Sequence, residues 1–217
     1  MITIQQAVGI ILKERVFLEE SIHEGLINLS SLARELRPQL EKMLSKPVNH
    51  GAIVMALKRH RPGKLVSINR KVQNLIENLN NIIVRLNISV YTFENSNKLY
   101  SKITDLSQKL QQEKGLFFTF SYGVFETTLI VNSKAEKQIS DMFEGEKLLA
   151  FQQQLACITL YLPGENTQIT GYYYYILKQI AWQGVNILEV ISTTNEFSLI
   201  IHDKDVDLAF SALKTKL

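Results

Sequence analysis

The stretch that decides the fold reads ACITLYL at residues 156–162, PGENT at 163–167 and TGYYYYILKQIAWQ at 170–183. The first segment is apolar and strand-like, the second is rich in turn-forming residues, and the third has apolar residues at helical spacing. Two more strand patterns follow at 185–193 and 197–201, and a helical pattern from Lys204 closes the chain. Strand, helix, strand, strand and helix in this order are most of a ferredoxin-like βαββαβ unit.

A weaker copy of the same order precedes this stretch. Its predicted elements are a strand at 82–93, a helix at 99–110 that Gly115 ends, strands at 116–122 and 124–131, a helix at 135–143 and a short strand at 147–151. We therefore predict an α+β protein in which two tandem ferredoxin-like units cover residues 82–153 and 154–217. No clear fourth strand follows the last helical pattern, so a neighbouring unit is expected to supply that edge of the second unit.

Three short amphipathic helices are predicted in residues 1–66, ahead of a linker helix at 67–81. Their expected bounds are Thr3 to Gly25, Ser30 or Ser31 to Leu44, and Asn49 to His60. Pro38 lacks a backbone donor, so the second helix either kinks there or begins again with Pro38 in its first turn. Three helices with a tight break before the last resemble a helix-turn-helix or winged-helix domain.

Basic residues are concentrated in the N-terminal part of the chain. Residues 1–80 contain 12 Lys and Arg against 7 Asp and Glu, whereas residues 81–217 contain 12 against 14. No acidic residue occurs between Glu41 and Glu77. A stretch of this kind is typical either of a surface that faces a polyanion such as DNA or of a solvated basic face.

The candidate nucleic-acid contacts are Lys46, Asn49, His50, Lys58, Arg59, Arg61 and Lys64. Helix-turn-helix proteins read bases mainly with the N-terminal part of the last helix. Here the cationic residues gather at the C-terminal end of that helix, and Asn49 and His50 are among the few polar side chains at its start. This arrangement favours contact with the DNA backbone, or a structural role, over the reading of sequence.

Several short motifs carry a resemblance to a known family in the second unit. They are Thr170-Gly171 at the start of the helix, Gly184-Val185-Asn186-Ile187 before the second strand, and Glu196-Phe197-Ser198-Leu199-Ile200-Ile201 in the third. With this spacing the unit resembles the ACT domain, most closely the form at the C-terminus of aspartokinases. The first unit matches that family only in element order, but aspartokinases also carry two such units in tandem.

The resemblance implies a regulatory receptor whose effector, usually an amino acid, sits at an interface between two ACT units. By position, the effector-binding residues would be Gly164, Glu165, Asn166, Thr167, Gln168, Ile169 and Thr170 of the strand-to-helix loop, with Asn186 and Ile187 opposite. The free N–H groups of a helix start suit the effector carboxylate. The Asn186 amide both donates and accepts hydrogen bonds, so it could hold either end of an amino acid.

Four consecutive tyrosines, Tyr172 to Tyr175, depart from the family pattern, which favours small residues there. Helical spacing suggests that Tyr173 faces the sheet while Tyr172 and Tyr175 project toward a neighbour or solvent. The rings could fill the effector pocket, form a subunit contact or simply pack.

The sequence offers little for catalysis. It lacks the catalytic domain of an aspartokinase, a phosphate-binding glycine loop and a nucleophile elbow. The four histidines lack the spacing of a zinc site, and Cys157 lies in an apolar strand pattern, where a buried, inert thiol is expected. We expect no enzyme activity, no cofactor, no metal, no membrane span and no secretory signal, and a cytoplasmic location.

The sequence therefore predicts a non-catalytic regulator that binds an amino acid or similar metabolite, as a homodimer or higher homo-oligomer. In one version the basic N-terminal domain binds DNA and controls transcription. The alternatives are a protein–protein module that regulates a biosynthetic enzyme and a structural dimer without a ligand.

Overall fold

The computed structural model describes residues 2–60, 72, 81–111, 116–162, 164 and 170–214. The chain forms a helical unit within Met1–Asn74 and a sheet unit within Leu75–Gln168 and Tyr172–Leu217. Of the linker helix predicted at 67–81, only Val72 and Asn81 are among the described residues. None of the described helices combines the length and hydropathy that a membrane span requires.

The helical unit contains four described helices where three were predicted: α1 (Ile4–Glu14), α2 (Val16–His23), α3 (Leu29–Leu44) and α4 (His50–Arg59). The prediction of a single helix from Thr3 to Gly25 was wrong, because the backbone leaves the helical region at Arg15, which has φ −120° and ψ 67°. The break lets α2 take a new direction in which Leu18 and Ile22 pack against the core. Gly25, just after α2, has a φ of +73°, a conformation that favours glycine.

Helix α3 runs through Pro38 without interruption. Pro38 is exposed, so the carbonyl that loses its backbone donor faces solvent and water can satisfy it. The Thr3 side chain forms a capping box with Gln6 at the start of α1, and Asn49, where the third helix was predicted to begin, caps α4.

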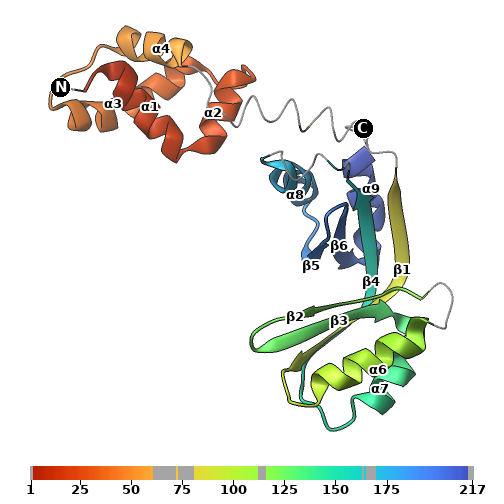
Figure 1. Cartoon of the computed structure of the whole chain (residues 1–217). Helices are drawn as coiled ribbons and strands as arrows, with labels where there is room; N and C mark the ends of the chain where they lie inside the picture. The colour runs from red at the N-terminus through yellow and green to blue at the C-terminus, as the bar shows by residue number, and fades with distance from the viewer. Residues whose placement is uncertain are drawn as a thin grey trace. The chain divides into compact units, whose positions relative to one another are not determined.

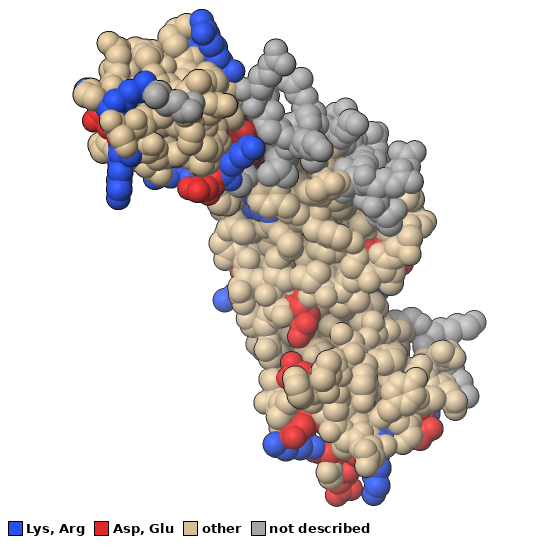
Figure 2. Space-filling model, turned by 60° about the vertical axis from the view of Figure 1, so that its left-hand side comes forward, with Lys and Arg blue, Asp and Glu red and all other residues tan. Residues whose placement is uncertain are grey.

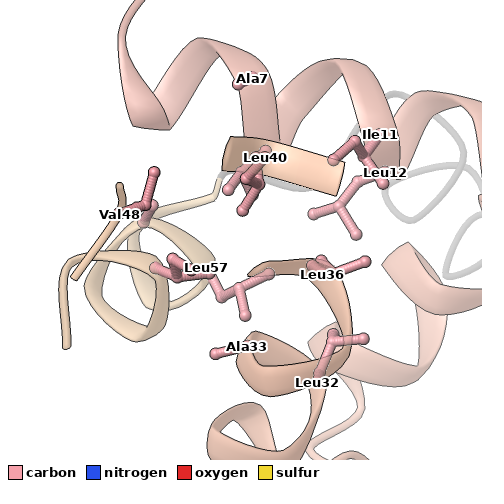
Figure 3. Close-up of a cluster of buried hydrophobic side chains, with 12 residues drawn as sticks. Ala7, Ile11, Leu12, Leu32, Ala33, Leu36, Leu40, Val48 and Leu57 are labelled. Atoms are coloured by element: carbon pink, nitrogen blue, oxygen red, sulfur yellow. The ribbon is translucent and has the colours of Figure 1, made fainter. Parts of the chain in front are cut away.

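The core of the helical unit lies between α1, α3 and α4 (Figure 3). Each helix contributes apolar residues spaced three or four apart, as the sequence predicts. The fully or almost fully buried members are Ala7, Val8, Ile11, Leu12, Leu32, Ala33, Leu36, Leu40, Val48, Ile53, Ala56 and Leu57. A pattern that buries one stripe of every helix produces a small bundle whose polar faces remain in water.

The sheet unit is one antiparallel sheet of six strands in the order β2-β3-β1-β4-β6-β5 (Figure 1). Its strands are β1 (Ile82–Glu94), β2 (Phe118–Tyr122), β3 (Glu126–Asn132), β4 (Leu148–Tyr161), β5 (Ile187–Ser192) and β6 (Glu196–His202). Its helices are α6 (Leu99–Gln111), α7 (Glu136–Met142), α8 (Tyr172–Trp182) and α9 (Val206–Lys214), of which α7 and α9 each follow a 3-10 turn. The predicted element order is confirmed, but the two predicted strands at 147–151 and 156–162 are parts of one strand, β4.

The two halves of the sheet share their central strands. The first residues of β1, Ile82 to Arg85, pair with the end of β4, and the last residues of β1 pair with its beginning. The start of β1 thus supplies the fourth strand that the second half lacks, which confirms the expectation that a neighbouring unit provides it. Because both long strands belong to both halves, the sheet is continuous rather than built from two separate units.

The internal repeat extends to strand register and backbone conformation. In the first half Ile88 of β1 lies opposite Asn132, and in the second half Leu155 of β4 lies opposite His202. Each of these positions follows a residue in the left-handed region, Asn87 with φ +58° and Gln154 with φ +56°. These residues sit at the register shifts in the middle of the β1–β4 ladder, where a bulge bends both strands without ending them.

The two faces of the sheet are buried by different partners. In the first half Tyr91, Phe93 and Leu129 lie under the helices α6 and α7. Residues on the opposite face of the sheet, including Val90 and Cys157, form one buried cluster with members from β1, β3, β4 and β6. The bend at the bulges therefore packs the helix-free faces of the two halves against each other. Burial also raises the pKa of the Cys157 thiol, in agreement with an inert cysteine.

Replacing Gln154 with glycine should stabilise the sheet unit by about 0.5–1 kcal/mol, because glycine adopts a positive φ without the steric cost that other residues bear. Gln154→Val should destabilise it by about 1–2 kcal/mol. Urea unfolding followed by circular dichroism measures both effects. Gln152→Gly, at an exposed position of the same strand with an ordinary φ, is the matched control and should be destabilising. Equal effects of glycine at both positions would contradict the role assigned to the bulge.

Glu41 connects α3 to the segment before α4 through hydrogen bonds. Its carboxylate accepts hydrogen bonds from the Val48 backbone N–H at 3.0 Å and from Arg37 Nε at 2.9 Å. These two donors, first the backbone and then Arg37, lower the pKa of Glu41 below its ordinary value of 4.5.

A group whose pKa is lower in the folded state stabilises that state above its unfolded pKa, and the stabilisation disappears as pH falls through the folded pKa. The wild-type protein should therefore be more stable than Glu41→Gln at pH 7, and this difference should shrink as pH falls below 4.5. Urea unfolding of both proteins between pH 7 and pH 3 measures it. A difference that stays constant over this range would show that the carboxylate charge is not responsible.

Candidate ligand-binding site

The helix α8 begins directly after Gly171, which has a φ of +86°. A glycine at this point of the chain is what the family resemblance predicts. Of the predicted loop residues, Gly164 and Thr170 are exposed, and Glu165, Asn166, Thr167, Gln168 and Ile169 lie outside the described residues. A Cβ built on Gly164 would meet no atom within 4 Å, so no steric contact of the described residues requires glycine at 164.

The turn before β5 has the geometry expected from its sequence. Gly184 has a φ of +72°, and its N–H bonds the Ala181 carbonyl at 2.9 Å to close the end of α8. Val185 is buried and anchors the turn, while Asn186 is exposed and Ile187 is half-buried. The Asn186 side chain forms no hydrogen bond with the part of the chain that the structure describes, so its amide is available to a ligand.

The start of α8 and Asn186 lie at opposite ends of β5 within one copy of the protein. Near the start of α8, the Tyr173 hydroxyl lies 2.8 Å from the Ser192 hydroxyl, and its ring centroid is 4.8 Å from that of Phe197. Ser192 is the last residue of β5, whereas Asn186 precedes its first. Six residues at about 3.3 Å each separate the two ends by roughly 20 Å. The sheet unit of one copy therefore does not bring Asn186 to the start of α8.

Tyr172 and Tyr175 face differently from the prediction, whereas Tyr173 contacts Phe197 and Ser192 of the sheet, as predicted. Tyr172 and Tyr175 are buried, with exposed fractions of 3% and 8%, whereas Tyr173 and Tyr174 are 45% and 37% exposed. The helical phase explains this, because Tyr172, Tyr175 and Ile176 share one face at steps of three and four residues. Burial raises the pKa of Tyr172, and its hydroxyl has no hydrogen-bond partner among the described residues. Tyr172 and Tyr173 lie at the helix start, so these two rings do not fill the turn at Asn186.

The equivalent strand-to-helix loop of the first half is closed by its own polar groups. The Ser96 hydroxyl accepts hydrogen bonds from the backbone N–H groups of Lys98 and Leu99 and donates to Glu146 Oε2 at 2.6 Å. Glu146 also forms an ion pair with Lys102 at 3.1 Å. The Ser96 hydrogen bond, and then Lys102, lower the pKa of Glu146.

This network was not predictable from the sequence, because Ser96 and Glu146 are fifty residues apart. Their only sequence signal is a serine at a helix start. The strand alignment also places Phe117 where the second half has Asn186, since Phe118 opens β2 as Ile187 opens β5. An asparagine at this position therefore belongs to the second half alone.

The predicted nucleic-acid residues do not form one cluster on the helical unit. The Asn49 side chain accepts a hydrogen bond from Gly51 N–H at 2.8 Å, and His50 Nε2 lies 2.9 Å from the Ser30 hydroxyl. Both polar side chains at the start of α4 are therefore engaged within the protein rather than free to read bases.

Lys46 and Arg59 line one surface hollow of about 500 Å³ beside α4, together with Met55. Lys58 lines a different hollow with His60, whose Nε2 lies 2.7 Å from Glu19 Oε1. Arg61 and Lys64 lie outside the described residues. On the face of the helical unit that is visible in Figure 2, the basic residues form separate groups with some acidic residues between them, and no continuous basic patch.

No protein-family model matches the chain, and no curated protein is significantly similar to it in sequence. Solved structures do resemble it in fold. The regulatory subunit of aspartate kinase from Thermus thermophilus, in its ligand-free form, has a TM-score of 0.50 and 12% sequence identity, over 63% of this chain and 96% of that chain. The regulatory subunit from Thermus flavus has a TM-score of 0.51 and 13% identity, over 64% and 97%.

The aspartate kinase of Clostridium acetobutylicum has a TM-score of 0.52 and 15% identity, over 64% of this chain and 34% of that chain. The match therefore spans about a third of the complete enzyme but nearly all of each Thermus regulatory subunit. These likenesses agree with the resemblance to ACT domains that the sequence predicts, and at this identity they establish fold alone. Most of this chain has the fold of an aspartate kinase regulatory subunit.

Proposed function

We propose that this protein is a non-catalytic regulator that binds an amino acid or similar small metabolite through its sheet unit. The proposal is supported by the match of nearly the whole of two aspartate kinase regulatory subunits to about two thirds of this chain, combined with the exposed amide of Asn186, which has no hydrogen-bond partner among the described residues. The turn that presents Asn186 is built by Gly184 and anchored by Val185, so its position is fixed before a ligand arrives.

The effector site we propose lies between two copies of the chain. One copy contributes the start of α8 with the preceding loop (Gly164 to Thr170), and the other contributes Asn186 and Ile187. This arrangement follows from the separation of roughly 20 Å along β5, which is too long for an amino acid to bridge within one copy. Binding would therefore favour the dimer, and the regulatory signal would be a change in subunit association.

A thermal-shift screen of the twenty amino acids tests the effector proposal. A ligand at a hundred times its dissociation constant should stabilise the protein by about 2.7 kcal/mol. Asn186→Ala should abolish the shift because it removes the amide, while Asn97→Ala, at an exposed asparagine in the loop of the first half, should retain it.

Sedimentation velocity with and without the stabilising amino acid tests the shared site, and the dimer fraction should rise on binding. Stabilisation of a protein that stays monomeric would contradict the two-copy site. Absence of any shift would leave a structural dimer, or a module that regulates a biosynthetic enzyme by direct contact, as the better explanation.

We propose contact with a nucleic-acid backbone as a second candidate function, which the helical unit would carry. Lys46 and Arg59 lie on one side of α4, where both could approach phosphates, while Asn49 and His50 are engaged within the protein. Contact of this kind holds a protein on DNA without selecting a sequence, so any control of transcription would need a further source of specificity.

Binding to a mixed-sequence DNA duplex should weaken steeply with salt, because each neutralised phosphate releases counterions. The double variant Lys46→Gln/Arg59→Gln should bind more weakly and flatten the slope of log K against log salt by about 1.8. Lys204→Gln, on the sheet unit, should leave both unchanged. Fluorescence anisotropy at several salt concentrations measures this, and a lack of binding at low salt would eliminate the candidate.

A further inference from the structure

A pocket of about 540 Å³ lies on the helix-covered side of the first half of the sheet, between α7 and the start of β4. Four aromatic rings line it: Tyr91, Phe93, Phe143 and Phe151. The rings contact one another, since the centroids of Tyr91 and Phe151 are 4.6 Å apart and those of Phe93 and Phe143 are 5.0 Å apart. A concave site of this size with a mainly apolar wall is typical of small-molecule binding.

The carboxylate of Glu136 lines this pocket and has no cationic partner among the described residues. Its Oε1 accepts a hydrogen bond from the Ser89 hydroxyl at 2.7 Å, and both oxygens lie 3.2 Å from the Gln153 amide nitrogen. Both donors are neutral, and no Lys, Arg or His of the described chain forms an ion pair with Glu136. The neighbouring Glu146, by contrast, is paired with Lys102. Glu136 is thus held in place by two side chains that orient its charge without neutralising it.

The carboxylate of Glu136 is close enough to the aromatic rings to affect them electrostatically. Burial, and after it the charge of Glu136, raises the pKa of Tyr91 to about 12. A cation in the pocket would therefore meet a fixed carboxylate and aromatic faces together. Aromatic faces attract cations, and the attraction is stronger where water is displaced.

The internal repeat allows the pocket residues of the first half to be compared with the residues at the same positions of the second half. The same positions of the second half hold aliphatic residues: Ile158 for Tyr91, Leu160 for Phe93, Val206 for Glu136, Leu213 for Phe143, Val84 for Phe151 and Leu86 for Gln153. Ser89, which holds Glu136, corresponds to Ala156. The second half forms the same sheet and helix arrangement with these aliphatic residues, so packing does not require the rings, the acid or its two donors.

We propose that this pocket binds a small organic cation, namely a primary amine or quaternary ammonium attached to an apolar or aromatic body. The ammonium would pair with Glu136, and the body would lie against Tyr91, Phe93 and Phe151. Glu144 lines the pocket together with Glu136, so a ligand that carries its own carboxylate would be repelled. The proposal thus concerns a ligand class and a site that differ from those of the amino-acid effector.

Isothermal titration of the full-length protein with three matched probes tests the charge requirement. Phenethylamine should bind, and phenethyl alcohol, which lacks the charge, should bind at least tenfold more weakly. Phenylalanine, which adds a carboxylate, should also bind at least tenfold more weakly when it is titrated into Asn186→Ala, where the proposed effector site does not contribute. Benzyltrimethylammonium should also bind, because a cation over aromatic faces does not need an N–H donor. Equal affinity for the amine and the alcohol would overturn the proposal.

Variants locate the site. Glu136→Gln should weaken phenethylamine binding at least tenfold, whereas Asp141→Asn, an exposed acid on the same helix outside the pocket, should have no effect. Phe151→Val copies the residue of the second half at a half-exposed position and should also weaken binding. Circular dichroism and urea unfolding establish that each variant is folded.

Asn186→Ala distinguishes this proposal from the proposed effector site, because it should leave phenethylamine binding unchanged. Amine binding that Asn186→Ala abolishes, or that Glu136→Gln leaves intact, would overturn the assignment to this pocket.

Discussion

The antiparallel pairing of β1 with β4 is the constraint on which the sheet unit depends. The two strands pair from Ile82 opposite Leu160 to Phe93 opposite Leu148, through the register shifts beside Asn87 and Gln154. Each half of the sheet obtains its fourth strand from this ladder, and each half is bent against the other at the two left-handed residues. The helices α6 to α9, the shared buried cluster and the turn at Asn186 all take their positions from it.

Sequence patterns predicted the order of elements in the sheet unit well, because each signal is local. Alternation identifies β1, the turn residues at Gly184 set the start of β5, and helical spacing identifies α8. The union of residues 147–151 and 156–162 into one strand was not predictable in this way. Gln154 gives no sign that its backbone is left-handed, and the partner that holds β4 extended lies some seventy residues earlier in β1.

The candidate sites, like the strands, were predictable only where the sequence signal is local. The family resemblance pointed to Asn186 because the residues around it form a continuous motif, and the structure presents its amide to solvent. The pocket around Glu136 carries no motif, since its members come from β1, α7 and β4, and Ser89 and Gln153 have no reason to be noticed in sequence. The burial of Tyr172 and Tyr175 was predicted wrongly because four identical residues show no periodicity of their own. Which of them is buried depends on the phase of the whole helix.

Because the two halves share β1 and β4, a fragment that contains only one half would be left with an unpaired strand edge. A fragment that starts at Gln154 would keep α8, α9 and three strands but would lose the segment Ile82–Arg85 that covers one side of β4. The exposed N–H and C=O groups of β4 would then template pairing with other chains, so such a fragment should self-associate. Reattaching residues 82–86 to the fragment through a flexible tether would restore the missing hydrogen bonds, which makes complementation of split chains a natural property of this architecture.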